Sequence, residues 1–300
     1  MENPIISWLF ETDAVRVCPE GQPFWYTSGK LGPFYINTQF LYGSEAAANA
    51  LLKTIEAACA GDKMDFYNTV WADISAQLES CPIFSQLIDL LAEAAAMMDA
   101  DFISGGERRD FFFSMPVAKK LGLGHLSIFK DLSSVYTDAN GVSMEPVDAN
   151  LAGKKSVHIA DLITVASSYI RAWIPAVEAL GAKIAYSLAV VDRDQGGTEI
   201  LANAGCPLTT LITIKPELFE QAKQLGRVTD AQIELVNSFI ADPDKFLHDF
   251  LVSHPDFLAN EIAKGGKSAQ RAELCIASSF APAEALPKGG ALFHYASPCF

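Results

Sequence analysis

Residues 156–168 read SVHIADLITVASS and join three features in order. A β-branched run ends at Asp161, a loop of small hydroxylated residues follows, and a helical pattern begins at Tyr169. The backbone N–H groups of such a loop and the N-terminus of the next helix face one anion. An acid at the end of the strand is placed to hold a ribose hydroxyl or a metal-bound water. The stretch therefore predicts a site for a phosphorylated sugar, with hydroxyl donors from Thr164, Ser167 and Ser168.

The neighbouring sequence alternates short apolar runs with helical patterns. Strands are expected at 102–103, 126–129, 157–159, 184–191 and 208–214, and helices at 111–121, 169–180 and 198–204. This alternation implies right-handed crossovers and a mostly parallel sheet. We predict an α/β fold in which helices flank that sheet. Ligands of such folds bind at the carboxyl ends of the strands, near a switch in strand order.

The pattern changes near Ile214 and divides the chain in two. Residues 1–214 carry all the expected strands and a helical insertion at about 60–98, which we expect to break at Cys81-Pro82 because proline interrupts a helix. Residues 215–300 show helical patterns and then an irregular tail. We expect an α/β domain followed by a helical C-terminal extension.

Composition excludes several classes of partner. The 300 residues are 50% hydrophobic, enough for a substantial core, and the formal net charge of −14 disfavours nucleic acid and anionic membranes. Acids interrupt apolar stretches such as 87–98, so no membrane span is expected, and the N-terminus lacks the basic region of a signal peptide. The 6 cysteines show no CxxC spacing and are interpreted as free thiols. We expect a cytoplasmic protein.

A second segment that contains candidate binding residues is SGGERRD, residues 104–110, which follows an expected strand. Gly105 and Gly106 allow a close backbone approach, and Arg108 and Arg109 are suited to clamp a diphosphate through bidentate contacts. The alternative is that these charges form a solvated helix start.

Two further segments carry candidate residues. In TSGKLGPFYIN, residues 27–37, Lys30 and the pair Phe34-Tyr35 could hold a flat anionic ring, although core packing is an equal alternative for the aromatic pair. In VDRDQGG, residues 191–197, Arg193 lies between two acids, a pattern typical of a surface ion-pair cluster.

The histidines favour no catalytic base or metal site. His125 and His158 lie in apolar strand contexts and are interpreted as packed core residues. No histidine and carboxylate have the spacing of metal ligands, so we expect no metal site built from protein side chains.

Taken in order, the four segments resemble orotate phosphoribosyltransferase, over about residues 25–214. The resemblance implies a type I phosphoribosyltransferase fold. It also implies attack of a base nitrogen on the anomeric carbon of phosphoribosyl pyrophosphate, with diphosphate leaving. Magnesium would be held chiefly by the substrate's oxygens. The implied partners are phosphoribosyl pyrophosphate and a base or nucleotide, and the implied assembly is a homodimer.

The resemblance also implies roles for individual residues. Asp161, Lys130 and Arg109 would be catalytic, with Asp161 on the ribose hydroxyls and Arg109 on the diphosphate. The expected substrate-binding residues are Lys30, Phe34, Tyr35, Arg108, Thr164, Val165, Ala166, Ser167, Ser168 and Arg193. Of these, Thr164 to Ser168 would surround the 5′-phosphate and Lys30, Phe34 and Tyr35 would line the base site.

The chain departs from the family pattern at several positions. Ala160 stands where a second acid is usual, and Ala166 stands where a glycine is usual. The segment that corresponds to the mobile catalytic loop, residues 131–153, has no Lys, Arg or His and four acids (Asp131, Asp138, Glu145 and Asp148). A structureless segment of that length is usually functional or mobile.

These departures leave two functions open. The first is a phosphoribosyltransferase of the orotate type acting on a pyrimidine-like base, which is favoured by Arg109, Asp161 and the hydroxylated loop. The second is a non-catalytic protein of the same fold that binds a nucleotide or sugar phosphate as a sensor or scaffold, which is favoured by the acidic segment. A plain nucleotide-binding domain is disfavoured because the chain lacks a GxGxxG or Walker loop.

Overall fold

The computed structural model describes residues 3–287. Its contacts divide the chain into two compact units, one of residues 1–15 and 36–225, the other of residues 16–35 and 226–300. The sequence pattern had suggested a division near residue 214. In the structure, an N-terminal segment also groups with the C-terminal helices, and the chain crosses between units within strands β1 (Val15–Val17) and β4 (Phe34–Ile36).

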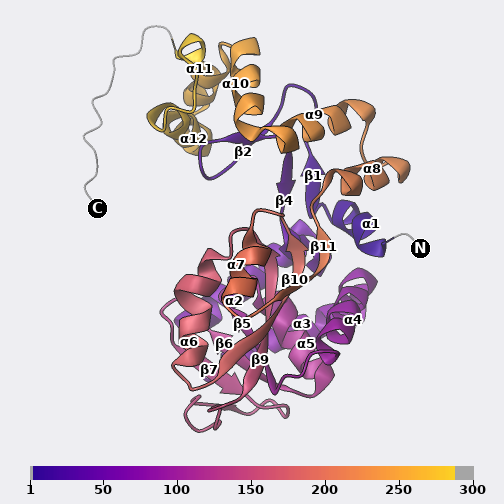
Figure 1. Ribbon diagram of the computed structural model, residues 1–300, viewed down its shortest axis with the longest axis vertical. Helices are drawn as coiled ribbons and strands as arrows, with labels where there is room; N and C mark the ends of the chain where they lie inside the picture. Colours follow the sequence, from indigo (N-terminus) through magenta and orange to yellow (C-terminus); the bar gives the residue numbers. More distant parts are fainter. Residues whose placement is uncertain (1–2, 288–300) are drawn as a thin grey trace. The chain divides into compact units, whose positions relative to one another are not determined.

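Unit 1 is built on a seven-stranded sheet with the order β11-β10-β9-β5-β6-β7-β8 (Figure 1). The pairs among β11, β10, β9, β5 and β6 are parallel, and β7 and β8 add antiparallel strands at one edge. The strands are β5 (Phe102–Gly106), β6 (Gly124–Ile128), β7 (Ser134–Thr137), β8 (Ser143–Met144), β9 (Lys155–Ile163), β10 (Lys183–Asp192) and β11 (Leu208–Thr213). The predicted α/β fold with a mostly parallel sheet is confirmed.

The strand order reverses between β5 and β9. From β5 the chain adds β6 on one side, and it later adds β9 on the other side and continues outward to β10 and β11. The β5–β9 ladder is short and ends at the pair Ser104 and His158, whereas β9 stays paired with β10 as far as Ile163. The ends of β5 and β9 therefore separate, which is the usual position of a ligand crevice in such a sheet.

Helices cover both faces of this sheet (Figure 1). On one face α5 packs on β5, β6 and β9, and α4 packs on α5. On the other, residues of η2, α6 and α7 share a buried cluster with the sheet, centred on Tyr169, Trp173 and Val177. The helices of unit 1 are α1 (Pro4–Glu11), η1 (Thr38–Tyr42), α2 (Glu45–Ala60), α3 (Phe66–Ser80), α4 (Pro82–Ala96), α5 (Phe111–Leu121), η2 (Tyr169–Trp173), α6 (Ile174–Glu178), α7 (Gly197–Asn203) and α8 (Pro216–Gln224).

Two expected elements differ from the structure. Residues 131–153 were expected to be irregular, but they contain the β7–β8 hairpin, whose turn is held by the Asp138 carboxylate accepting the N–H groups of Asn140 and Val142. The helix expected at 169–180 begins as a π-helical turn and becomes α-helical at Ile174. Pro175 has no N–H to donate, so regular α-helical bonding is interrupted at this point.

Unit 2 combines a short hairpin with C-terminal helices. Strands β2 (Phe24–Trp25) and β3 (Leu31–Gly32) pair antiparallel, and their buried Trp25 and Leu31 share a core with Leu247 and Leu258. The helices are α9 (Asp230–Ala241), α10 (Pro243–Ser253), α11 (Phe257–Lys264), α12 (Gly266–Ala277) and η3 (Ala283–Ala285). Sequence analysis did not predict α12, because its buried positions are small residues, Ala272 and Cys275, that give little apolar periodicity.

Two further findings concern the cysteines and the length of the helices. Five cysteines are free thiols, and the sixth, Cys299, lies outside the described residues, as does the end of the tail expected to be irregular. No helix within residues 3–287 has the length and apolar character needed to cross a bilayer.

Candidate functional site

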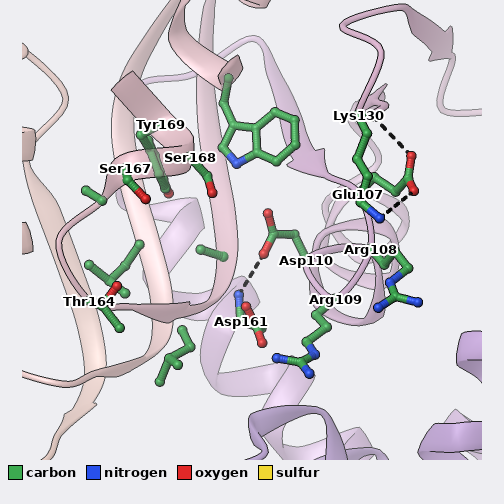
Figure 2. A pocket seen from close by; sticks show the side chains of 15 residues that line it. Glu107, Arg108, Arg109, Asp110, Lys130, Asp161, Thr164, Ser167, Ser168 and Tyr169 are labelled. Carbon is green, nitrogen blue, oxygen red and sulfur yellow. Dashed lines mark hydrogen bonds and ion pairs between the residues drawn. The ribbon is translucent and has the colours of Figure 1, made fainter. Parts of the chain in front are cut away.

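A cavity of about 360 Å³ opens where β5 and β9 separate (Figure 2). That volume is within the range of small-molecule sites. Three strand ends supply its walls: the segment after β5, Lys130 after β6, and the end of β9 with the loop that follows. The lining residues are Glu107, Arg108, Arg109, Asp110, Lys130, Ala160, Asp161, Leu162, Ile163, Thr164, Ala166, Ser167, Ser168, Tyr169 and Trp173.

The hydroxylated loop lies on one side of the cavity, as Figure 2 shows. Thr164, Ser167 and Ser168 all line it, whereas Val165 is 47% exposed and is not a lining residue. Ala166 has φ +50, so it holds the left-handed conformation that favours glycine. The loop therefore keeps the backbone that a glycine would adopt freely, with an alanine in its place.

Asp161 has an unusual electrostatic environment. Burial and, second to it, the negative charge of Asp110 raise the pKa of its carboxyl group to about 7, while Arg109 acts in the opposite direction. In Figure 2 the Arg109 guanidinium and the Asp161 carboxylate lie on the same side of the cavity. A carboxyl group with such a pKa changes its charge near neutral pH, so it can serve as an acceptor that switches with pH.

Asp110 bridges the separated strand ends, and sequence analysis missed this role. Its Oδ2 accepts the Gly106 N–H at 3.1 Å, and its Oδ1 accepts the Asp161 N–H at 3.0 Å. The β5–β9 ladder has already ended at Ser104 and His158, so the carboxylate takes two N–H groups that the ladder leaves unpaired. An acid next to the two arginines was visible in the sequence, but its two backbone partners come from strands about 50 residues apart.

A buried polar network lies behind Asp110. His158 Nδ1 is 3.0 Å from Ser104 Oγ, and its Nε2, which has no hydrogen-bond partner, is 3.5 Å from Asp110 Oδ2. His125 is bonded to serine hydroxyls, and burial, helped by the neighbouring His158, lowers its pKa to about 3. Both histidines are buried in the core, as the sequence predicted.

Most basic side chains of the cavity are engaged with acids. Arg108 forms an ion pair with Glu56 of α2. Lys130 Nζ is 3.4 Å from Glu107 Oε1, and the Lys130 N–H donates to the other carboxylate oxygen at 3.1 Å. Among residues 3–287, no ion pair within 4 Å is found for Arg109. Arg109 is therefore the lining cation best placed to meet an incoming anion.

The two glycines of the second segment have close neighbours within the protein itself. A Cβ on Gly106 would lie 2.3 Å from the ring of Trp173, and one on Gly105 would lie 2.1 Å from Ser114 Oγ. The space beside each glycine is therefore filled by packed side chains of the protein, and a close approach of a ligand to this backbone stays a prediction.

Besides Val165, four candidate residues are not among the lining residues of the cavity. Lys30, Phe34 and Tyr35 belong to the hairpin region of unit 2. Lys30 Nζ is 2.5 Å from Asp244, the Phe34 ring packs edge-on against Phe239, and Tyr35 packs against Phe24. Arg193 donates its backbone N–H to Ile163 at 2.9 Å but is not a lining residue. The base-site assignment of the three unit 2 residues stays a prediction.

The acidic segment contributes no side chain to the cavity lining found within residues 3–287. Asp131 is 2.5 Å from Lys63, and hydrogen bonds from Lys63 and Ser133 lower its pKa to about 2. Asp138 holds the hairpin turn, and the N–H of Val142 is the main reason its pKa is lowered. Two of the four acids therefore have local structural partners.

Comparison with known proteins supplies relatives for about half of the chain. An adenine phosphoribosyltransferase of Burkholderia pseudomallei (strain 668) is 30% identical over 152 residues, which are 47% of this chain and 81% of that protein. One from Paraburkholderia phymatum is 30% identical over 149 residues, 46% of this chain and 79% of that protein. A scan against protein-family models finds no match.

Among solved structures, UMP synthase of Leishmania donovani matches with a TM-score of 0.54 at 15% identity. The match covers 79% of this chain and 42% of that one, so this chain spans less than half of UMP synthase and the likeness is one of fold. Fold and cavity together define an α/β protein with a cavity at the switch in strand order, lined in part by the hydroxylated loop after β9. The chain belongs to the type I phosphoribosyltransferase family, as the sequence predicted.

Proposed function

We propose that the chain binds phosphoribosyl pyrophosphate in this cavity and transfers the phosphoribosyl group to a nucleobase, with release of diphosphate. The observation that carries the proposal is the convergence of Asp161, Arg109 and the loop containing Ser167 and Ser168 on one cavity at the switch in strand order. The family of the chain supports the same reaction class.

Each part of the cavity has a role in this reaction. The loop would hold the 5′-phosphate through backbone N–H groups and hydroxyls. Asp161 would accept hydrogen bonds from the ribose hydroxyls, and Arg109 would bind the diphosphate as it leaves. The transition state is cation-like at the sugar, so catalysis rests mainly on positioning and on stabilising the leaving group.

Magnesium would arrive with the substrate. Of the carboxylates that line the cavity, Asp110 is bonded to backbone and Glu107 to Lys130, which leaves Asp161 as the acid able to approach a cation beside the ribose. One carboxylate fits a Mg²⁺ ion whose other ligands are substrate oxygens and water. The ion would neutralise charge on the diphosphate as the bond to the sugar breaks.

The finer proposal concerns the base. The order of the sequence motifs favours a pyrimidine-like base of the orotate type. Adenine is the competing base, because the curated relatives at 30% identity are adenine phosphoribosyltransferases. An assay must therefore offer both.

A second candidate function is binding without turnover, as a sensor or scaffold. It is favoured by the engagement of Lys130 with Glu107 and by the lack of basic residues in 131–153, which removes cations that could close over a diphosphate. The homodimer implied by the resemblance stays a prediction under either function.

The test is diphosphate release from phosphoribosyl pyrophosphate and Mg²⁺ in the presence of orotate, adenine, uracil or hypoxanthine. We expect release with one base and a loss of about 10²- to 10³-fold in kcat/KM for Arg109→Ala, because a preorganised charge on the leaving group is removed. Glu93→Gln, on the exposed surface of α4, is the matched control and should retain activity. Absence of release with every base, together with measurable binding of ribose 5-phosphate, would replace transfer by the binding function.

A further inference from the structure

The cavity contains an anion supplied by the protein. Asp110 is buried, with 8% of its surface exposed, and its carboxylate accepts the N–H groups of Gly106 and Asp161 at 3.1 and 3.0 Å. These two donors lie at the ends of β5 and β9, on either side of the switch in strand order. Backbone N–H groups at such a position are the donors that an anionic ligand would use.

The Asp110 carboxylate leaves few free hydrogen-bond donors for a ligand in this part of the cavity. Both of its oxygens accept backbone N–H groups, one from the end of each strand. The His158 ring nitrogen lies 3.5 Å from Oδ2 on the side away from the cavity, so contacts on three sides fix the position of Asp110. In Figure 2 its side chain extends into the middle of the cavity, between the hydroxylated loop and the Glu107–Lys130 pair. A ligand oxyanion that sought the same donors would have to displace it against charge repulsion.

The two ends of the cavity differ in the acidic side chains that they contain. The loop that contains Ser167 and Ser168 carries no acid, so a phosphomonoester bound there meets only neutral donors. The end that contains Arg109 also holds Asp110 and Asp161, and its other two cations already have acidic partners, Arg108 with Glu56 and Lys130 with Glu107. A diphosphate, with its higher charge, therefore meets more repulsion than a monoester does.

We propose that Asp110 is a specificity-determining residue: its carboxylate occupies the donors between β5 and β9, and the cavity therefore favours a ribose phosphomonoester over diphosphate. The favoured ligands are ribose 5-phosphate and nucleoside 5′-monophosphates. The inference rests on the proposed function in that it takes the loop 164–168 as the monoester site. It adds that the diphosphate end is restrained by the chain's own acid.

Calorimetric titration of the full-length protein with ribose 5-phosphate, and separately with diphosphate and Mg²⁺, tests the inference. We expect the wild-type protein to bind ribose 5-phosphate at least about tenfold more tightly than diphosphate. In Asp110→Ala both donors become available, so diphosphate should bind about 10- to 100-fold more tightly, as expected for hydrogen bonds to a charged group. Ribose 5-phosphate should change by less than about threefold, because its phosphate site is the loop 164–168, and Asp161, the ribose contact that is bonded to Asp110, keeps its own carboxylate.

Two controls separate specificity from folding and from net charge. Glu93→Gln removes one negative charge from the exposed surface of α4 and should leave both affinities within about twofold. Asp110→Asn removes the charge but keeps the side-chain size, and it should give an intermediate gain for diphosphate. Thermal unfolding of each variant checks that it is folded.

The outcomes distinguish this inference from the proposed function. Wild-type affinities that are equal, or that favour diphosphate, overturn the inference, and so does a folded Asp110→Ala or Asp110→Asn variant with no tighter diphosphate binding. If the wild-type protein binds neither ligand, the proposed function fails. Tighter diphosphate binding by the variants then still supports the role of Asp110.

Discussion

The two loops that line the cavity meet an anion by different means. Residues 164–168, TVASS, carry no charge and offer hydroxyls and backbone N–H groups, whereas residues 107–110, ERRD, are all charged. Three of those four charges are engaged within the protein: Glu107 with Lys130, Arg108 with Glu56, and Asp110 with the N–H groups of Gly106 and Asp161. The neutral loop is therefore the more open anion site, although the charged loop contains the arginines.

The difference shows that the number of charged side chains in a loop does not measure how well the loop can bind an anion. A cation that has an internal partner offers less to a ligand than a neutral N–H that has none, because the ligand must compete for the cation. Arg109 is the exception in the charged loop, and its guanidinium lies on the same side of the cavity as Asp161. We expect three substitutions to break or sharpen this contrast, beginning with the largest effect.

Asp161→Asn changes the residue that precedes the neutral loop and is bonded to Asp110 of the charged loop, and it should have the largest effect. Burial raises the pKa of Asp161 to about 7, so between about pH 4 and pH 7 the folded protein holds a proton that the unfolded chain has lost. The free energy of unfolding of the wild-type protein should therefore fall as pH rises through this window, by an amount on the order of 2 kcal/mol, and stay level above it. The asparagine variant should lack that fall.

Denaturant unfolding of both proteins at pH 5 and pH 8 measures this difference. The variant should gain stability relative to wild type at pH 8 and yet bind ribose 5-phosphate about tenfold more weakly, since it has lost the ionised acceptor for the ribose hydroxyls. Parallel pH profiles for the two proteins would show that Asp161 ionises at an ordinary pKa. Unchanged binding would remove Asp161 from the site.

Ala166→Gly tests the neutral loop. Ala166 has φ +50, a conformation that costs a residue with a Cβ roughly 1 kcal/mol more than it costs glycine. Greater freedom of glycine in the unfolded chain offsets part of this gain. We expect a net stabilisation of about 0.5 kcal/mol in denaturant unfolding, with Ala176→Gly in α6 as a destabilised control. A destabilised Ala166→Gly variant would mean that the loop relaxes in solution.

Glu56→Gln tests the charged loop and should have the smallest effect. It releases Arg108 from its ion pair, and because both side chains are partly exposed, the free energy of unfolding should change by less than about 1 kcal/mol. Diphosphate should bind about two- to fivefold more tightly, since Arg108 lines the cavity and would be available to it. Calorimetric titration beside Glu93→Gln measures the effect, and equal affinities in the two variants would show that the ion pair does not restrain Arg108.

Much of the fold and one side of the cavity could be predicted because their signals are local. The strand ending at Asp161, the loop after it and the helix start are contiguous in sequence, and the alternation of strands and helices directly implies a parallel sheet. The segment after β5 was identified for the same reason. Its two arginines follow a short apolar strand and two glycines.

The parts that were missed depend on distant partners. The role of Asp110 arises because β5 and β9 separate at one residue pair, a matter of register that no local pattern reveals. The packing of Phe34 against Phe239 and the ion pair of Lys30 with Asp244 join residues more than 200 positions apart. The β7–β8 hairpin was missed because its strands are short and its turn is held by a side-chain carboxylate.

The discontinuous unit 2 has a consequence for the timing of synthesis. Trp25 donates its indole N–H to Glu261, a partner 236 residues later in the chain. At ordinary rates of translation, that separation corresponds to roughly 10 to 50 s during which the hairpin has been made but its helices have not. During that interval Trp25 and Leu31 cannot form their shared core with Leu247 and Leu258. The nascent chain therefore carries an exposed apolar hairpin while unit 1 is still being synthesised.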